Sequence, residues 1–248
     1  MRQIKITLIC IFVTLTLSGF LLIRGAQSAS HHEGLVLYCA AGLRVPVSEF
    51  VEHFERETSI PVHVTYNGSG ALLTQLQLKG GDLYLPADEE YIREAQAMGL
   101  ALAATPLFPL TAKIVVHRDN TKIHSYEDLS RPNLRISFAD ESSAIGRFSK
   151  ELLTKHQLFE HIRPNIVVTK PTVNSVLEDV ALGAADATIA WSSVADNFKE
   201  LRCIEMPLLE SNPRHASIAI LKNSNNRNQA QQFIDLLRSS SGENPSTR

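Results

Sequence analysis

A glycine- and serine-rich turn that opens into a helix is the strongest chemical signal in this sequence. A run typical of a strand ends at Tyr66-Asn67, and Gly68-Ser69-Gly70 leads from it into a run of leucines at helical spacing. The first amides of a helix have no partner within it and carry the positive end of its dipole, so small side chains there favour an anion site. The hydroxyl of Ser69 offers one more donor. The same residues also suit a plain N-cap, in which Ser69 accepts a hydrogen bond from an amide one turn later.

Strand-like and helix-like patterns alternate along the chain from residue 35 onward. Short apolar runs such as 35–39 and 134–138 are typical of buried strands, and apolar residues recur every three or four positions in the segments that follow them. This alternation predicts an α/β fold with mainly parallel sheets flanked by helices. Ligands bind such sheets beyond the carboxyl ends of the strands, where Gly42 and Ser69 lie.

Two similar blocks of this kind indicate a hinged protein with two lobes. We predict that residues 29–112 and 214–248 form lobe 1 and that residues 113–213 form lobe 2, because the chain returns to an apolar strand near residue 217. The two short connections between the blocks would act as the hinge.

Composition and charge restrict the partners. The 248 residues are 44% hydrophobic, and 24 basic residues nearly balance 26 acidic ones, for a formal net charge of −2. No run of Lys and Arg is longer than two residues, so nucleic acid is not an expected partner. The histidines are scattered and no Cys-x-x-Cys occurs, so we expect neither a metal site nor a cofactor.

The N-terminus has the features of an export signal. Arg2 and Lys5 precede an apolar run over residues 6–23, and Ala26-Gln27-Ser28 offers small residues for cleavage. We therefore expect residues 1–28 to be a signal peptide and the mature protein to be periplasmic or otherwise extracytoplasmic. The apolar run is also nearly long enough to span a bilayer, so an uncleaved anchor is the alternative.

Export would leave Cys39 and Cys203 in the mature chain. An oxidising compartment would allow them to pair, whereas the place of Cys39 at the end of an apolar strand is more typical of a buried free thiol. The sequence leaves their pairing open.

Five short segments carry a resemblance to a known family. They are residues 40–43, 67–72, 81–88, 144–146 and 188–191, which read AAGL, NGSGAL, GDLYLPAD, AIG and TIAW. In this order and spacing they resemble the periplasmic molybdate-binding proteins of ABC importers, over nearly all of the chain after the signal. The resemblance implies a type II periplasmic binding fold that closes over molybdate or tungstate and delivers it to a membrane permease.

The resemblance also implies which residues contact the ligand. Members of the family hold their oxyanion with two serine hydroxyls, with backbone amides at helix starts and with a tyrosine hydroxyl. By position, Ser69 matches the second serine, and Ile145 and Val173 match the backbone-amide donors.

Two positions depart from the family pattern. Gly42 stands where the first serine is expected, and Trp191 stands where the tyrosine is expected. The amide of Gly42 or Leu43 and the indole N–H of Trp191 offer replacement donors. Arg44 either brings a full charge to the same place, which would favour another anion, or is a solvated residue on the outer face of its helix.

Other ligands and one enzyme class stay open from the residues alone. The same fold can bind sulfate, phosphate, a small carboxylate or a metal chelate, as a receptor or a sensor, because fold does not fix function. Carboxylates in the pocket would indicate a cation, and an inward Arg44 would indicate an organic anion. A serine hydrolase is the remote alternative, since no histidine is tied to Ser69 by spacing and no Gly-x-Ser-x-Gly occurs. We expect a monomeric binding protein that is not an enzyme.

Overall fold

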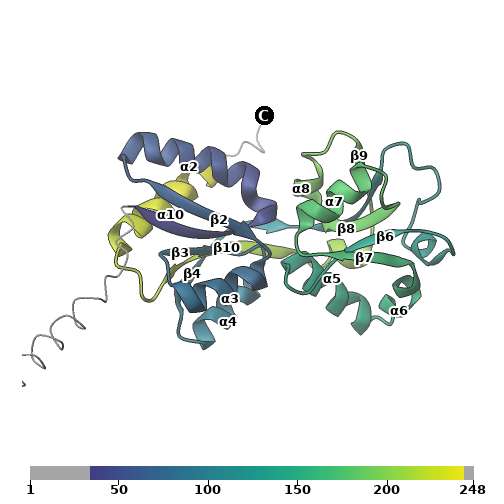
Figure 1. The fold of residues 1–248 in the computed structure, drawn as a ribbon, viewed down its shortest axis with the longest axis horizontal. Helices are drawn as coiled ribbons and strands as arrows, with labels where there is room; N and C mark the ends of the chain where they lie inside the picture. The colour runs from purple at the N-terminus through teal and green to yellow at the C-terminus, as the bar shows by residue number, and fades with distance from the viewer. Residues whose placement is uncertain (1–33, 243–248) are drawn as a thin grey trace, which may run out of the picture. The chain divides into compact units, whose positions relative to one another are not determined.

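The computed structural model describes residues 34–242, so the expected signal peptide at residues 1–28 lies outside the described part. Within this range the chain forms two five-stranded sheets, each with helices on both faces (Figure 1). We call the first sheet with its helices lobe 1 and the second sheet with its helices lobe 2. The predicted two-lobed α/β fold is confirmed. Among the described residues, no helix has the length and apolar character that crossing a membrane requires.

The sheet of lobe 1 contains β1 (Leu35–Ala40), β2 (Val62–Asn67), β3 (Leu83–Leu85), β4 (Ala101–Leu110) and β10 (Arg214–Leu221), in the order β2-β1-β3-β10-β4. Strand β1 pairs in parallel with β2 and β3, and β10 pairs antiparallel with β3 and β4. The register places Ala40 beside Asn67, so the carboxyl ends of β1 and β2 lie together.

The helices of lobe 1 are α2 (Arg44–Thr58), preceded by the 3-10 turn η1 (Ala41–Leu43), α3 (Ser69–Lys79), α4 (Glu90–Ala97) and α10 (Arg227–Gly242). Helices α2 and α10 cover one face of the sheet, and α3 and α4 cover the other (Figure 1). The predicted apolar stripe of α2 is buried, and its Phe50 and Phe54 rings each lie 5.0 Å from the ring of Phe233 on α10. The helix ends where Ser59 takes a left-handed conformation.

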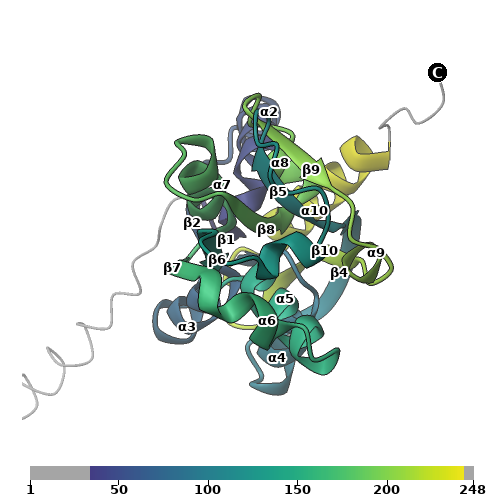
Figure 2. The ribbon, with the colours of Figure 1, turned by 90° about the vertical axis from the view of Figure 1, so that its right-hand side faces the viewer.

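The sheet of lobe 2 contains β5 (Ala112–His117), β6 (Ile136–Ala139), β7 (Ile166–Lys170), β8 (Ala187–Trp191) and β9 (Leu201–Ile204), in the order β7-β6-β8-β5-β9. Its helices are α5 (Ala144–Lys155), α6 (Phe159–Ile162), α7 (Val173–Ala181), α8 (Ser192–Ala195) and α9 (Pro207–Glu210), with the 3-10 turns η2 (Glu127–Ser130) and η3 (Arg163–Asn165). Helices α7 and α8 lie on one face and α5 and α6 on the other (Figure 2).

Both sheets are mixed, which corrects the expectation of mainly parallel ones. In lobe 2, β6 pairs in parallel with β7 and β8, whereas β5 pairs antiparallel with β8 and β9. Two of the four strand pairings in each sheet are therefore antiparallel. The cause is the double crossing: the chain leaves lobe 1 along β4 and returns along its neighbour β10, and it enters lobe 2 along β5 and leaves along its neighbour β9.

The first crossing is very short. A single residue, Thr111, separates β4 from β5, and its carbonyl accepts a hydrogen bond from the Ser192 amide at 2.9 Å. The return crossing enters β10 at Arg214. Both crossings thus lie beside the end of β8, where Trp191 pairs with Ala112.

The two described cysteines are free thiols on different sheets. Cys39 is buried on β1 and Cys203 is half-buried on β9. Burial raises the pKa of each thiol, which favours the neutral, unreactive form.

Candidate functional site

A small cavity lies where the carboxyl ends of strands from both lobes meet. The centre of a water-sized sphere can occupy about 20 Å³ of it. Lobe 1 and lobe 2 both contribute to its wall. The lining residues are Ala40, Ala41, Gly42, Asn67, Gly68, Ser69, Ala87, Ser143, Ala144, Ile145, Thr172, Val173 and Trp191.

Four helix starts point their first residues at this cavity. Gly42 lies in the turn that begins α2, Ser69 begins α3, Ile145 is in the first turn of α5 and Val173 begins α7. Within residues 34–242, the backbone amides of these four residues have no hydrogen-bond partner. The cavity is therefore surrounded by free amide donors and by the positive ends of helix dipoles from both lobes.

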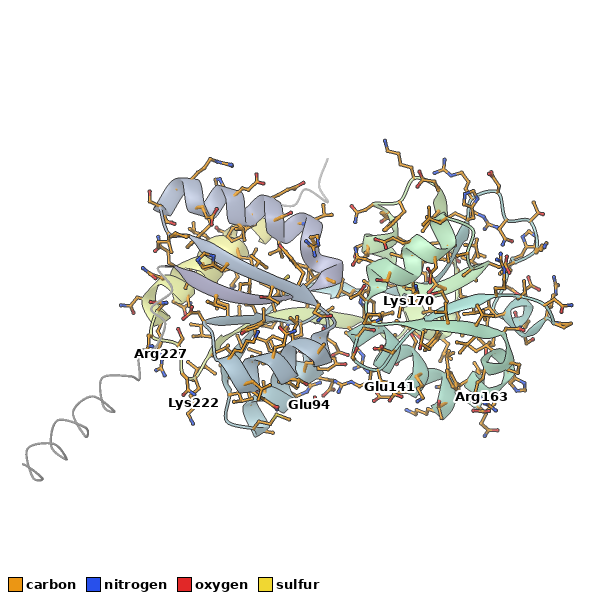
Figure 3. All side chains as sticks on the ribbon, in the orientation of Figure 1. Glu94, Glu141, Arg163, Lys170, Lys222 and Arg227 are labelled. Carbon is orange, nitrogen blue, oxygen red and sulfur yellow. The ribbon has the colours of Figure 1, made fainter. Side chains whose placement is uncertain are left out.

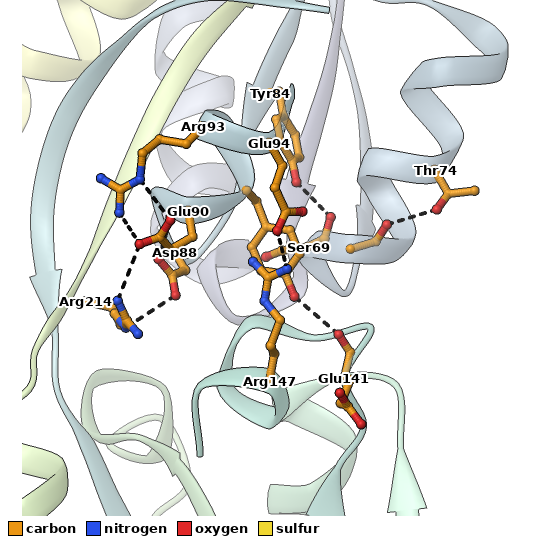
Figure 4. Close-up of polar contacts among 12 residues, drawn as sticks. Ser69, Thr74, Tyr84, Asp88, Glu90, Arg93, Glu94, Glu141, Arg147 and Arg214 are labelled. Carbon is orange, nitrogen blue, oxygen red and sulfur yellow. Dashed lines mark hydrogen bonds and ion pairs between the residues drawn. The ribbon is translucent and has the colours of Figure 1, made fainter. Parts of the chain in front are cut away.

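The Ser69 side chain is fixed by the strand that follows α3. Its Oγ accepts a hydrogen bond from the Ala87 amide at 3.2 Å, and its carbonyl accepts one from the Tyr84 hydroxyl at 2.8 Å (Figure 4). The side chain is 1% exposed. Because the oxygen already accepts from Ala87, its own proton is available for donation into the cavity.

Trp191 closes the cavity from the end of β8. Its ring is buried and stacks on Phe148 with centroids 5.7 Å apart. Its Cδ1 lies 3.9 Å from the point where a Cβ on Gly42 would stand, so the pyrrole edge of the indole faces lobe 1. In the described chain the indole N–H has no protein partner, and it is not sealed in the core. It can therefore serve as a donor to a ligand.

Two hydroxyls in the wall are already used as helix caps. Ser143 Oγ accepts from the Gly146 amide at 3.1 Å, and Thr172 Oγ1 accepts from the Ser175 amide at 3.2 Å. These caps fix the first turns of α5 and α7 and so position the free amides beside them.

Among the described residues, those that line the cavity include no charged side chain and no histidine. The same range holds no group of three or more His, Cys, Asp and Glu side chains placed to hold a metal ion. Asp88 is a buried carboxylate that directly follows the lining residue Ala87 in the sequence. Its Oδ2 lies 3.4 Å from Arg214 Nε. Burial raises the pKa of Asp88.

Two residues named from the sequence do not line the cavity. Leu43 is 2% exposed because its side chain packs into the core of lobe 1. Arg44 is exposed on α2, and its guanidinium lies 4.1 Å from the ring centre of Tyr66. In this structure Arg44 therefore does not bring a charge into the pocket.

Asn67 is a lining residue that the sequence reasoning passed over. Its Oδ1 accepts from the Gly68 amide at 2.8 Å, and no other hydrogen bond of the described chain involves its side chain, which leaves the NH₂ group as a donor. Its place directly before Gly68-Ser69, at the end of a strand, was the available signal.

An ion pair, a hydrogen bond and a contact between a guanidinium and a ring join the lobes beside the cavity. Glu94 on α4 and Glu141, just before α5, lie on the two sides of the lobe boundary (Figure 3). Arg147 of α5 reaches across this boundary and donates to Glu94 Oε1 at 2.6 Å (Figure 4). Its guanidinium lies 3.6 Å from the ring centre of Tyr91, whose hydroxyl donates to the Glu141 carbonyl at 3.3 Å. The structure thus has the two lobes in direct contact.

Comparison with known proteins sets the class of this chain. Residues 35–246 match the family model described as bacterial extracellular solute-binding protein. The chain belongs to this family of solute-binding proteins. One curated relative is the molybdate-binding protein ModA of Mycobacterium tuberculosis, which is 25% identical over 213 residues, 84% of this chain and 80% of the relative.

Solved structures agree with the fold of this solute-binding protein. The periplasmic molybdate-binding protein of Azotobacter vinelandii has a TM-score of 0.69 at 17% identity, over 82% of this chain and 92% of that one. AfuA of Actinobacillus pleuropneumoniae, solved with fructose-6-phosphate bound, has a TM-score of 0.73 at 18% identity, over 85% and 81%. At these identities the likeness shows the fold alone, and the two neighbours bind different ligands.

Proposed function

We propose that this solute-binding protein captures a tetrahedral oxyanion, molybdate or tungstate, in the cavity between its lobes and delivers it to an ABC permease. The observation that carries the proposal is the set of free donors at Gly42, Ser69, Ile145 and Val173, which surround one small cavity whose wall holds no charge. Neutral donors and helix dipoles can hold a doubly charged anion without a counter-ion in the wall.

A wall of donors selects by protonation state. A fully ionised tetraoxyanion accepts hydrogen bonds on every oxygen, whereas an ion that keeps a proton would bring that proton against a donor and leave the donor unpaired. Phosphate carries a proton near neutral pH, but sulfate, molybdate and tungstate do not. The proposed site therefore rejects phosphate because of its proton, and only the size of the cavity can separate sulfate from molybdate and tungstate.

The relatives support the choice among these ions. ModA of Mycobacterium tuberculosis and the Azotobacter vinelandii protein are both named as molybdate-binding proteins. AfuA holds a sugar phosphate in the same fold, so the ligand must be argued from the cavity and not from the fold.

The alternatives fit the wall less well. A carboxylate such as citrate has many more atoms than a tetraoxyanion and would need more room than this small cavity offers. Arg44, whose charge would favour an organic anion, lies outside on Tyr66. A metal chelate would need carboxylate ligands, and a serine hydrolase would need a base beside Ser69, yet the described lining residues include neither carboxylate nor histidine.

The proposed mechanism follows from the two lobes. An anion that contacts helix starts of both lobes favours the closed state through those contacts, and a permease that recognises the closed state then receives the ligand. In this proposal the protein acts as a monomer outside the cytoplasm. Its location requires that residues 1–28 direct export.

Thermal unfolding of residues 29–248 with a panel of anions tests this proposal. A ligand at 100 times its Kd stabilises a protein by roughly 2.7 kcal/mol, which raises the Tm of a chain of this size by several degrees. We expect molybdate and tungstate to raise the Tm and phosphate and citrate to leave it unchanged. A rise with citrate or phosphate alone would contradict the proposed ligand.

A further inference from the structure

At three positions on the lobe 1 side of the cavity, a glycine is present although the backbone conformation does not require one. Gly42, Gly68 and Gly70 all have backbone angles that other residues adopt, in contrast to Gly80 and Gly99, which have positive φ. The reason for glycine at the first three positions must therefore be the space that a side chain would need.

At Gly42 and Gly68 that space is occupied by lobe 2, and at Gly70 it is shared by the Ser142 carbonyl of lobe 2 and the Tyr91 ring of lobe 1. A Cβ on Gly42 would lie 2.8 Å from Val173 Cγ1 and 3.2 Å from Val194 Cγ2. Both neighbours are β-branched and buried, so they have little freedom to turn away. No lobe 1 atom is among the three nearest to this point, so the glycine serves the contact between the lobes and not the packing of its own lobe.

The other two glycines bring backbone against backbone. A Cβ on Gly68 would lie 2.6 Å from the Ser142 carbonyl oxygen and 2.7 Å from that of Pro171. The Gly70 amide donates to the same Ser142 carbonyl at 2.8 Å. Lobe 1 therefore meets lobe 2 through residues without side chains, directly beside the lining residues Ser69 and Val173.

We propose that these glycines set how far the lobes close and that Gly42 is the residue that limits the size of the bound anion. The inference rests on the proposed function, since it concerns the ligand of the same cavity. A side chain at Gly42 would have to move the lobes apart by about 1 Å to restore an ordinary carbon–carbon contact. The donors of the two lobes would then no longer reach the same small ion, and the smallest ion would lose most.

For the same reason, a hydroxyl at position 42 should not increase the affinity for the ligand. A serine at position 42 adds a donor, but it also adds the Cβ that meets Val173 and Val194. If closure is the limit, Gly42→Ser behaves like Gly42→Ala. If Gly42 is only a missing donor, Gly42→Ser binds more tightly than the native protein.

The test compares Gly42→Ala, Gly42→Ser and the double variant Gly42→Ala/Val173→Ala with the native protein and with Val173→Ala. Calorimetry gives the Kd for molybdate and sulfate, and small-angle X-ray scattering gives the decrease in radius of gyration on saturation. We expect both Gly42 variants to bind molybdate about tenfold more weakly or worse, the size of one lost charge-assisted hydrogen bond. We expect the affinity for sulfate to fall by a larger factor than the affinity for molybdate. We expect the double variant to bind molybdate about as tightly as Val173→Ala does.

Two results would overturn the inference: a Gly42→Ala protein that closes and binds as the native protein does, or a Gly42→Ser protein that binds more tightly. Failure of the native protein to bind any tetraoxyanion would instead overturn the proposed function, and this inference with it. Should Gly42→Ala fail to fold, Val173→Ile adds bulk from the opposite lobe and must weaken binding in the same way for the inference to hold.

Discussion

The Ser69 hydroxyl oxygen accepts a hydrogen bond from the Ala87 amide at 3.2 Å, so its proton is left for the cavity. Ser69→Ala removes the proposed ligand donor and also leaves the buried Ala87 amide without a partner. We expect affinity to fall about tenfold to a hundredfold, for a lost charge-assisted bond of roughly 1.5–3 kcal/mol. We expect the free energy of unfolding to fall by about 1–3 kcal/mol. Calorimetry and urea denaturation measure the two effects.

Ser149→Ala is the matched control for this change. Ser149 is also buried, at 1% exposure, and its Oγ has no hydrogen-bond partner, but it does not line the cavity. Its replacement should leave affinity unchanged and should not lower stability. Equal losses of affinity in the two variants would remove Ser69 from the site.

Trp191 provides both a donor and a signal. It is the only tryptophan in the 248 residues, so a ligand beside its indole N–H should change the fluorescence of the native protein. Trp191→Phe keeps an aromatic ring beside Phe148 but removes the N–H, and we expect about a tenfold loss of affinity or more. Fluorescence that stays constant at saturation, together with native affinity in Trp191→Phe, would contradict this role.

Arg147 holds the lobes together without touching the cavity. Its contacts with Glu94 and Tyr91 join α5 of lobe 2 to α4 of lobe 1. Arg147→Met keeps the apolar stem and removes the charge, which costs the closed state about 1 kcal/mol and weakens ligand binding roughly fivefold. Scattering should also show a larger radius of gyration without ligand.

Arg163→Met is the control for that variant. Arg163 forms an exposed ion pair with Glu160 within lobe 2, 2.7 Å between Nε and Oε2, away from the lobe boundary (Figure 3). Its removal should change neither affinity nor closure. If Arg147→Met binds as tightly as Arg163→Met, the contacts across the boundary do not contribute to closure.

Asp88 gives a pH dependence of stability. Burial raises its pKa above the ordinary 3.8, so the folded state holds this proton at pH values where the unfolded state has lost it. The native protein should therefore lose stability relative to Asp88→Asn as pH rises from below 3.8 through the raised pKa, and the difference should then level off. Urea denaturation of both proteins across this range measures it. A difference that grows in favour of the native protein with rising pH would contradict the direction.

The sequence was sufficient to place most of the candidate site because the site is made of backbone. Strand ends followed by small residues predict free amides, and Gly42, Ser69, Ile145 and Val173 do lie around one cavity. Their role in binding stays a prediction.

Local sequence patterns could not predict contacts between segments that lie far apart in the chain. Arg147 and Glu94 lie 53 residues apart, and nothing local in either helix indicates that they meet. Arg44 could not be placed for the same reason, since its position depends on the Tyr66 ring of a neighbouring strand. The mixed sheets were missed because strand direction follows from the double crossing and not from any residue pattern.

The most direct test of the proposed function is isothermal titration calorimetry of residues 29–248 with molybdate in the presence of excess sulfate. The proposed function predicts one molybdate per protein and an affinity that sulfate at millimolar concentration does not abolish. Absence of molybdate binding, or its complete displacement by sulfate, would show that this charge-free, donor-lined cavity does not select the metal oxyanion.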